Sequence, residues 1–372
     1  MNQTTPKKWH DWLADPAIFF YACLWLVVLV IAGTLAQPGI GLYKAQEIYF
    51  SSWFFPMGPV PLPGGRLTMA VIFVNLVIYL IFNASPKKNI GLYITHLGTL
   101  LLLLGGFLTA YFSSEGTMVI QEGGSSDYVS DYHAREFVII TPGSDEDKVT
   151  AFGMGWLKAG SILKHESIPG EIEILEAYTN CEARRRDAMD PSFKGLGSQY
   201  TIRPIPDNPQ DEQNMYGFVA AFRGFGPNAD GNYVFVEYQN DPTQVADKIC
   251  VLRKKRTYVP FQIELIDFEK KLHPGTQMPK SYKSVVNLIE EGQKRRVVIQ
   301  MNEPLRHKGY TFFQSSFIEG QGGGKDSTVL AAVKNYGRQF PYISSIIMSI
   351  GLLIYLMILV PRRRRVMQSK EG

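Results

Sequence analysis

The sequence predicts a membrane protein in which four transmembrane α-helices carry a large, mainly β extracytoplasmic domain. Three observations support this fold class: four long apolar stretches, basic residues at one end of each stretch, and a polar, strand-rich segment before the last stretch. The mean hydropathy of -0.05 is that of a soluble protein because it averages the two kinds of segment. A sliding window of about 19 residues separates them.

Each apolar stretch is long enough to cross the hydrocarbon core of a bilayer, which needs roughly 20 helical residues. The stretches cover residues 17–37, about 67–83, 90–112 and about 341–360. Asp15 and Pro16 precede the first stretch. Asp15 is expected to cap the N-terminus of this helix, and Pro16 to lie in its first turn. The first stretch exceeds the roughly 7–15 apolar residues of a signal peptide, so we expect it to stay as a helix.

Basic residues flank these stretches on the side that the positive-inside rule assigns to the cytoplasm. They are Lys7, Lys8, Lys87, Lys88 and Arg362 to Arg365. We therefore predict a multi-pass protein of the inner (cytoplasmic) membrane with both termini in the cytoplasm. The domains expected are a membrane region over residues 1–112 with an external loop at 38–66, an extracytoplasmic domain over 113–340, and a last helix with a basic tail over 341–372.

Short strand-like runs, separated by Gly, Pro, Asn and Asp, dominate the external segment. Residues 171–176 and 232–238 alternate between apolar and polar side chains, whereas 137–140 and 296–299 suit buried strands. They predict a β-sandwich or a barrel-like domain. Residues 181–231 are rich in Arg, Asp, Pro and Gly, and we expect them to form a long loop or insertion outside the core.

The motifs that are absent exclude several functions. The three cysteines, Cys23, Cys181 and Cys250, form no CxxC, so neither a thioredoxin-type redox site nor a c-type haem attachment site is present. The sequence does not decide whether Cys181 and Cys250 form a disulfide. No GxSxG, phosphate-binding glycine loop or HExxH occurs. The basic runs 184–186 and 254–256 suit solvated faces or lipid headgroups better than nucleic acid.

His96 is the residue that suggests a functional site within the membrane. It lies six residues after the start of the third stretch, roughly 9 Å from the cytoplasmic end of a helix. An ionisable group is costly in hydrocarbon, and neutral imidazole is a common axial ligand of haem iron. The alternative is a histidine hydrogen-bonded between helices. Gly98, Gly105 and Gly106 allow another helix to approach closely.

The remaining histidines lack the i, i+4 or HxH spacing of a metal site. We expect surface or loop positions for His10, His133, His165, His273 and His307.

Three groups of short motifs follow one another along the chain. The first is 33–37, 41–47 and 50–54, and the second is 95–98, 115–116 and 121–123. The third is 260–261, 267–268, 273–276, 281–284, 301–305 and 309–317. This ordered set spans nearly the whole chain and resembles the ResB (CcsB) family of system II cytochrome c biogenesis proteins.

The resemblance implies a subunit of the machinery that moves haem outward and attaches it to apocytochrome c. It implies a separate CcsA (ResC)-type membrane partner, whose tryptophan-rich WWD segment this chain lacks, and a thioredoxin-like thiol reductant. The family's intramembrane ligand to b-type haem maps onto His96, which would share the iron with a histidine of the partner. No catalytic residue is assigned, and we expect a non-catalytic or co-catalytic subunit of a haem lyase (synthase).

A second hypothesis is a membrane-anchored extracytoplasmic binding or scaffold protein without a haem role, in which His96 only ties two helices together. Alanine or asparagine at His96 would be tolerated in a scaffold, whereas a haem subunit would lose its haem. The sequence leaves open whether the β domain holds apocytochrome or braces the partner.

Overall fold

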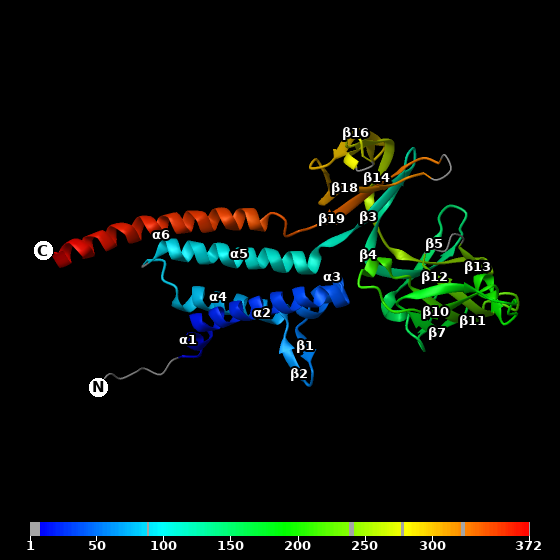
Figure 1. The fold of residues 1–372 in the computed structure, drawn as a ribbon, viewed down its shortest axis with the longest axis horizontal. Coiled ribbons are helices and arrows are strands. Elements are labelled where there is room, and N and C mark those ends of the chain that lie inside the picture. The colour runs from blue at the N-terminus through cyan, green and yellow to red at the C-terminus, as the bar shows by residue number, and fades with distance from the viewer. Residues whose placement is uncertain (1–7, 88, 238–241, 277–278, 321–323, 372) are drawn as a thin grey trace. The chain divides into compact units, whose positions relative to one another are not determined.

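The structure of the chain, a computed structural model, describes residues 8–87, 89–237, 242–276, 279–320 and 324–371, with side chains described up to residue 360. Lys7, Lys88 and the side chains of Arg362 to Arg365, which contribute to the predicted orientation, lie outside the described residues. The chain forms two compact units (Figure 1). The helical unit comprises residues 1–113 and 334–372, and the β unit comprises residues 114–333.

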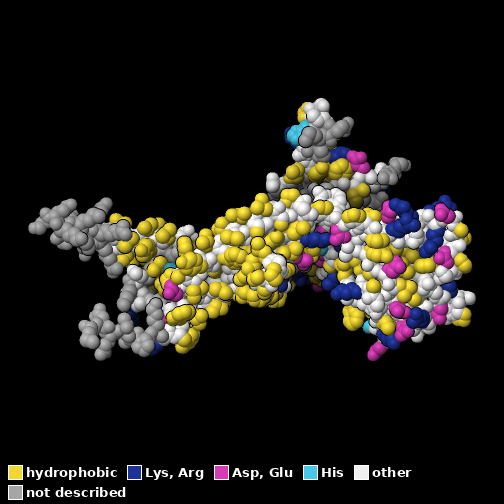
Figure 2. Space-filling view, turned by 60° about the horizontal axis from the view of Figure 1, so that its bottom comes forward, with side chains coloured by type: hydrophobic (Ala, Val, Ile, Leu, Met, Phe, Trp, Pro, Cys, Tyr) yellow, Lys and Arg dark blue, Asp and Glu magenta, His cyan; other side chains and the backbone are white. Residues whose placement is uncertain are grey.

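Among the described residues, four helices are long and apolar enough to cross a membrane, in agreement with the four predicted spans. The elements involved are α1 (Trp9–Leu13) with α2 (Pro16–Ile40), α4 (Gly65–Ile78) with the π-helical η2 (Tyr79–Asn83), α5 (Ile90–Phe112) and α6 (Phe340–Glu371). Asp15 caps α2 as predicted, because its Oδ1 accepts a hydrogen bond of 2.9 Å from the Ala17 N–H. Figure 2 shows hydrophobic side chains covering the surface of these helices.

The connection between α2 and α4 folds back along α2. It consists of α3 (Leu42–Ala45), the π-helical η1 (Gln46–Phe50) and the hairpin of β1 (Phe54–Met57) and β2 (Val60–Pro63). A Cβ atom at Gly33 would lie 2.8 Å from the Phe50 ring, so the absence of a side chain allows η1 to pack on α2.

Glycines spaced seven residues apart let α5 pack closely against α6. They are Gly91, Gly98 and Gly105, and all three are buried. A Cβ atom at Gly98 would lie 2.7 Å from Met348 Cγ. Seven residues are close to two helical turns, so the three glycines share one face. The expected close approach is confirmed for Gly98 and Gly105 and wrong for Gly106, which has no described atom within 4 Å of an added Cβ.

The β unit contains two large sheets. The ten-stranded sheet follows the order β16-β15-β14-β4-β3-β19-β18-β17, and β5 and β13 pair with β4 and β14. Its strands are β3 (Ser114–Gln121), β4 (Ser125–Thr141), β5 (Lys148–Gly153), β13 (Thr243–Val245), β14 (Lys248–Leu272), β15 (Pro279–Glu290), β16 (Gln293–Gln300), β17 (Leu305–His307), β18 (Tyr310–Ile318) and β19 (Ser327–Lys334). The five-stranded sheet contains β6 (Ile162–Leu163), β7 (Glu171–Tyr178), β11 (Gly217–Arg223), β12 (Gly231–Val236) and β9 (Phe193–Lys194).

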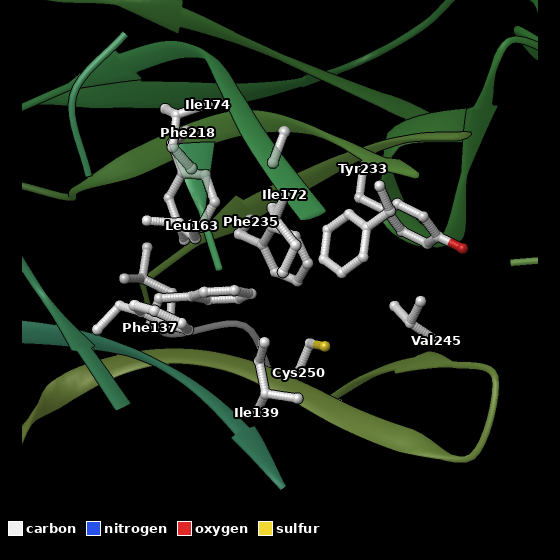
Figure 3. Close-up of a cluster of buried hydrophobic side chains, with 14 of the residues drawn as sticks. Phe137, Ile139, Leu163, Ile172, Ile174, Phe218, Tyr233, Phe235, Val245 and Cys250 are labelled. Atoms are coloured by element: carbon white, nitrogen blue, oxygen red, sulfur yellow. The ribbon is translucent and has the colours of Figure 1, made fainter. Parts of the chain in front are cut away.

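One hydrophobic core joins the two sheets, as in a sandwich. Phe137 of β4 faces Phe218 of β11 and Phe235 of β12, with ring centroids 5.1 and 4.8 Å apart (Figure 3). A second core lies within the ten-stranded sheet, where side chains from distant strands such as Met118, Ile263 and Phe312 pack together. The predicted mainly β fold is therefore confirmed, with one face-to-face core and one core enclosed by a curled sheet.

The expectation of a loop over residues 181–231 is wrong. This stretch contains β8 (Cys181–Arg185), β9, β10 (Tyr200–Pro204) and β11. β11 lies between β7 and β12, and all its residues except Arg223 are buried. A strand covered on both faces shows no alternation of polar and apolar residues, which is why the pattern was missed.

Candidate functional site

His96 lies on the face of α5 that points away from α6. At about 100° per residue, two residues separate His96 from Gly98 by roughly 160° around the helix. Gly98 contacts α6, so His96 faces the other side. Tyr79 of η2 lies there, with its ring centroid 5.2 Å from that of His96 and the two planes 41° apart. Both side chains are half-buried.

The hydrogen bond of His96 fixes its tautomer. Nδ1 lies 2.8 Å from the Leu92 carbonyl oxygen, one turn earlier in the same helix. Because a carbonyl oxygen only accepts, Nδ1 carries the hydrogen, and Nε2 of the neutral ring keeps its lone pair. No hydrogen bond to Nε2 occurs within the described parts of the chain. The imidazole is thus oriented by a backbone carbonyl and presents an unprotonated nitrogen.

These features fit an axial ligand of haem iron. Histidines that bind metals usually donate their other ring N–H to a carbonyl or carboxylate, which orients the ring and makes the free nitrogen more basic. The Leu92 carbonyl has this role for His96. Among the described residues, no group of three or more His, Cys, Asp or Glu is placed to hold a metal ion, so His96 would offer haem iron a single nitrogen.

The other histidines have varied surroundings. The expected surface or loop position is wrong for His10, which lies in α1 with its ring stacked on Phe82 of η2 at 4.9 Å and 13°. His133 pairs with Asp211 at 2.8 Å and His307 with Glu290 at 3.0 Å, both in the β unit. No sequence signal indicated these contacts, because each partner is distant in the chain.

Residues from three separate motifs meet in the β unit. The rings of Phe268 and Phe317 stack with centroids 5.6 Å apart and planes at 22°, and Tyr282 lies against both. Beneath them, the Ser284 hydroxyl donates to Gln314 Oε1 at 2.6 Å. The motifs were identified only by their order in the sequence, and the structure places them on the paired strands β14 and β15 and on β18, which packs against β15.

A buried ion pair connects β4 to the end of β12. Arg135 Nε lies 2.8 Å from Glu237 Oε2, and the two side chains are 5% and 2% exposed. Arg135 also donates to the carbonyl oxygens of His133 and Asn214. The pair therefore holds the ten-stranded and five-stranded sheets together by polar contacts in addition to the shared core.

Comparison with known proteins gives two matches. A model of the ResB-like family matches residues 217–325, which run from β11 to β18 and include the three stacked aromatic rings. The chain is 23% identical over 346 residues to Protein NrfI of Wolinella succinogenes. That alignment covers 90% of this chain and 34% of NrfI, so the chain spans about a third of the length of this relative.

Proposed function

The chain belongs to the ResB-like family, and we propose on that basis that it acts in cytochrome c assembly. In this role it is a membrane subunit that helps to export haem and to present it for covalent attachment to apocytochrome c. A CcsA/ResC-type membrane protein is the proposed partner, and a thioredoxin-like protein supplies reduced cysteine thiols. The β unit lies outside the cytoplasmic membrane and both termini lie inside, an orientation supported by the basic residues that flank the helices.

The observation that carries this proposal is the free Nε2 atom of His96. Leu92 holds Nδ1–H, Tyr79 restricts the ring, and α6 occupies only the opposite side of α5. A histidine that merely tied two helices together would use its nitrogens between helices, whereas the recorded hydrogen bond of His96 lies within α5. The second axial ligand comes from a histidine of the partner.

In this proposal the chain binds haem, whereas the bond-forming reaction takes place between haem and apocytochrome. Thioether bonds form between haem vinyl groups and cysteine thiols, and this reactivity belongs to haem and to apocytochrome. The residues of this chain bind and orient haem as cargo: His96 binds the iron, Leu92 fixes the tautomer, and the apolar helix surfaces exclude water. No residue of this chain is proposed to be catalytic.

The test is the visible spectrum of the complex purified with its CcsA-type partner after haem-replete expression. We expect a Soret band and sharp α and β bands on reduction in the wild type. His96→Ala should weaken them, and added imidazole should restore them. Thr99→Val is the matched control, because Thr99 lies one turn further on and its hydroxyl donates to the Thr95 carbonyl oxygen and to Met348 Sδ of α6. Absence of haem from the wild-type complex would refute the proposal and favour the scaffold hypothesis.

A further inference from the structure

We propose that His10 forms a second site for an iron porphyrin, distinct from His96. The inference rests on the proposed function, which supplies the class of ligand. The geometry that carries it is an imidazole held between aromatic rings where α1 contacts η2.

Aromatic rings fix the His10 side chain. Its ring stacks on Phe82, and Trp9 contacts both rings edge-on, at 5.7 Å from His10 and 5.6 Å from Phe82. The His10 side chain is 19% exposed. Apolar walls around an imidazole are the surroundings in which haem is bound, because the porphyrin face is itself apolar.

The two ring nitrogens of His10 differ in their surroundings. Nδ1 is buried without a hydrogen bond, and it lies 3.4 Å from Asp11 Oδ1, which is an ion-pair distance. Nε2 has no hydrogen-bond partner among the described residues, and unlike Nδ1 it is not fully buried. The 3.4 Å separation places Nδ1 beside a carboxylate without a hydrogen bond, so this nitrogen is enclosed by the protein. Nε2 is therefore the donor atom that His10 offers.

The number of ligands distinguishes a porphyrin from a bare metal ion. A bare transition metal ion needs three or four protein ligands, and the described residues contain no group of three or more suitable side chains. A porphyrin supplies four nitrogens itself, so a single imidazole completes its binding. Lys8 is exposed two residues before His10 and can pair with a propionate.

The π-helical segment η2 connects the two histidines. Phe82 contacts His10 and Tyr79 contacts His96. η2 is the π-helical last turn that follows α4, and it ends at Ala84 in extended backbone. Trp9 and Trp12 are 63% and 72% exposed, as expected for rings at a membrane interface. In the proposed orientation this interface is cytoplasmic, so His10 is the first imidazole that haem from the cytoplasm meets.

The experiment uses the full chain with its partner in nanodiscs and titrates ferric haem into variants that lack the inner ligand. His96→Ala should retain a weak Soret band of iron bound by one histidine. Adding His10→Phe, which preserves the stacking, should raise the Kd at least about tenfold. His273→Phe is the matched control, because His273 is an exposed histidine of the β unit. Iron-free protoporphyrin IX should bind equally with and without His10→Phe, since it forms no axial bond.

The outcomes separate this inference from the proposed function. Equal ferric haem affinities with and without His10→Phe overturn the inference and leave His96 as the ligand. An equal loss of ferric haem and iron-free porphyrin also overturns it, because His10 would then act through packing. A wild-type complex that contains no haem refutes the proposed function instead.

Discussion

Replacing Gly91 by alanine tests the packing of α5 against α6. The added Cβ atom would lie 2.6 Å from the Gly351 carbonyl oxygen and 2.7 Å from Tyr355 Cα, and it would overlap the Tyr355 backbone nitrogen. These are backbone atoms, so no side-chain rotation relieves the overlap. Overpacking of this kind typically costs roughly 1–3 kcal/mol, against a gain of about 1 kcal/mol from the better helix propensity of alanine.

Gly106→Ala is the matched control, because it lies in the same helix and an added Cβ there meets no described atom within 4 Å. Alanine favours the helix at both positions, and at Gly91, in the first turn of α5, the overlap acts against this preference. We expect Gly91→Ala to unfold more easily than Gly106→Ala by roughly 1–3 kcal/mol. Unfolding in mixed micelles with increasing SDS, followed by circular dichroism, measures this difference. Equal stability of the two variants would refute the proposed close packing of α5 and α6.

Three further predictions concern the β unit. Burial raises the pKa of Cys181 to about 11 and of Cys250 to about 12. Both thiols should therefore react with maleimide at pH 8 only after the protein is denatured. Rapid labelling of the native protein would contradict their burial. Because folding raises these pKa values, the free energy of unfolding should decrease as the pH rises above the usual thiol range, and Cys250→Val should flatten that decrease. Glu237→Ala should lower the free energy of unfolding in urea by roughly 3 kcal/mol, because it removes the carboxylate 2.8 Å from buried Arg135 and leaves Asp211 at 3.6 Å with the His133 and Asn214 carbonyl oxygens. Glu237→Gln, which keeps an acceptor, should lower it less.

The sequence predicted the elements whose signal is local. Four apolar stretches and the cap at Asp15 were sufficient for the helices, because span length and first-turn chemistry depend on neighbouring residues. Glycine composition indicated close helix packing, but it did not distinguish Gly105 from Gly106, which lie about 100° apart on the helix. Only the position of α6 decides which of them is buried.

Features that depend on distant contacts escaped prediction. The contact of His10 with Phe82 joins residues 72 positions apart, and nothing near His10 in the sequence indicates it. β11 was missed because it is covered on both faces and lies in a stretch whose composition suggests a loop. His96 was identified because an ionisable group in an apolar helix is a local anomaly. The tautomer of His96 was not predicted, because its hydrogen bond to Leu92 depends on the side-chain rotamer.

The two faces of α5 explain why the proposed haem site requires a second protein. The glycine face is fully used by α6, which fixes the position of the helix. The opposite face carries His96 with Nε2 free, and Tyr79 contacts the ring without competing for that nitrogen. In the proposed site, a second histidine would bind the iron on the other side of the porphyrin. Among the described residues, His10 stacks on Phe82, and His133 and His307 pair with carboxylates of the β unit, so in the proposed site the second histidine would come from the partner.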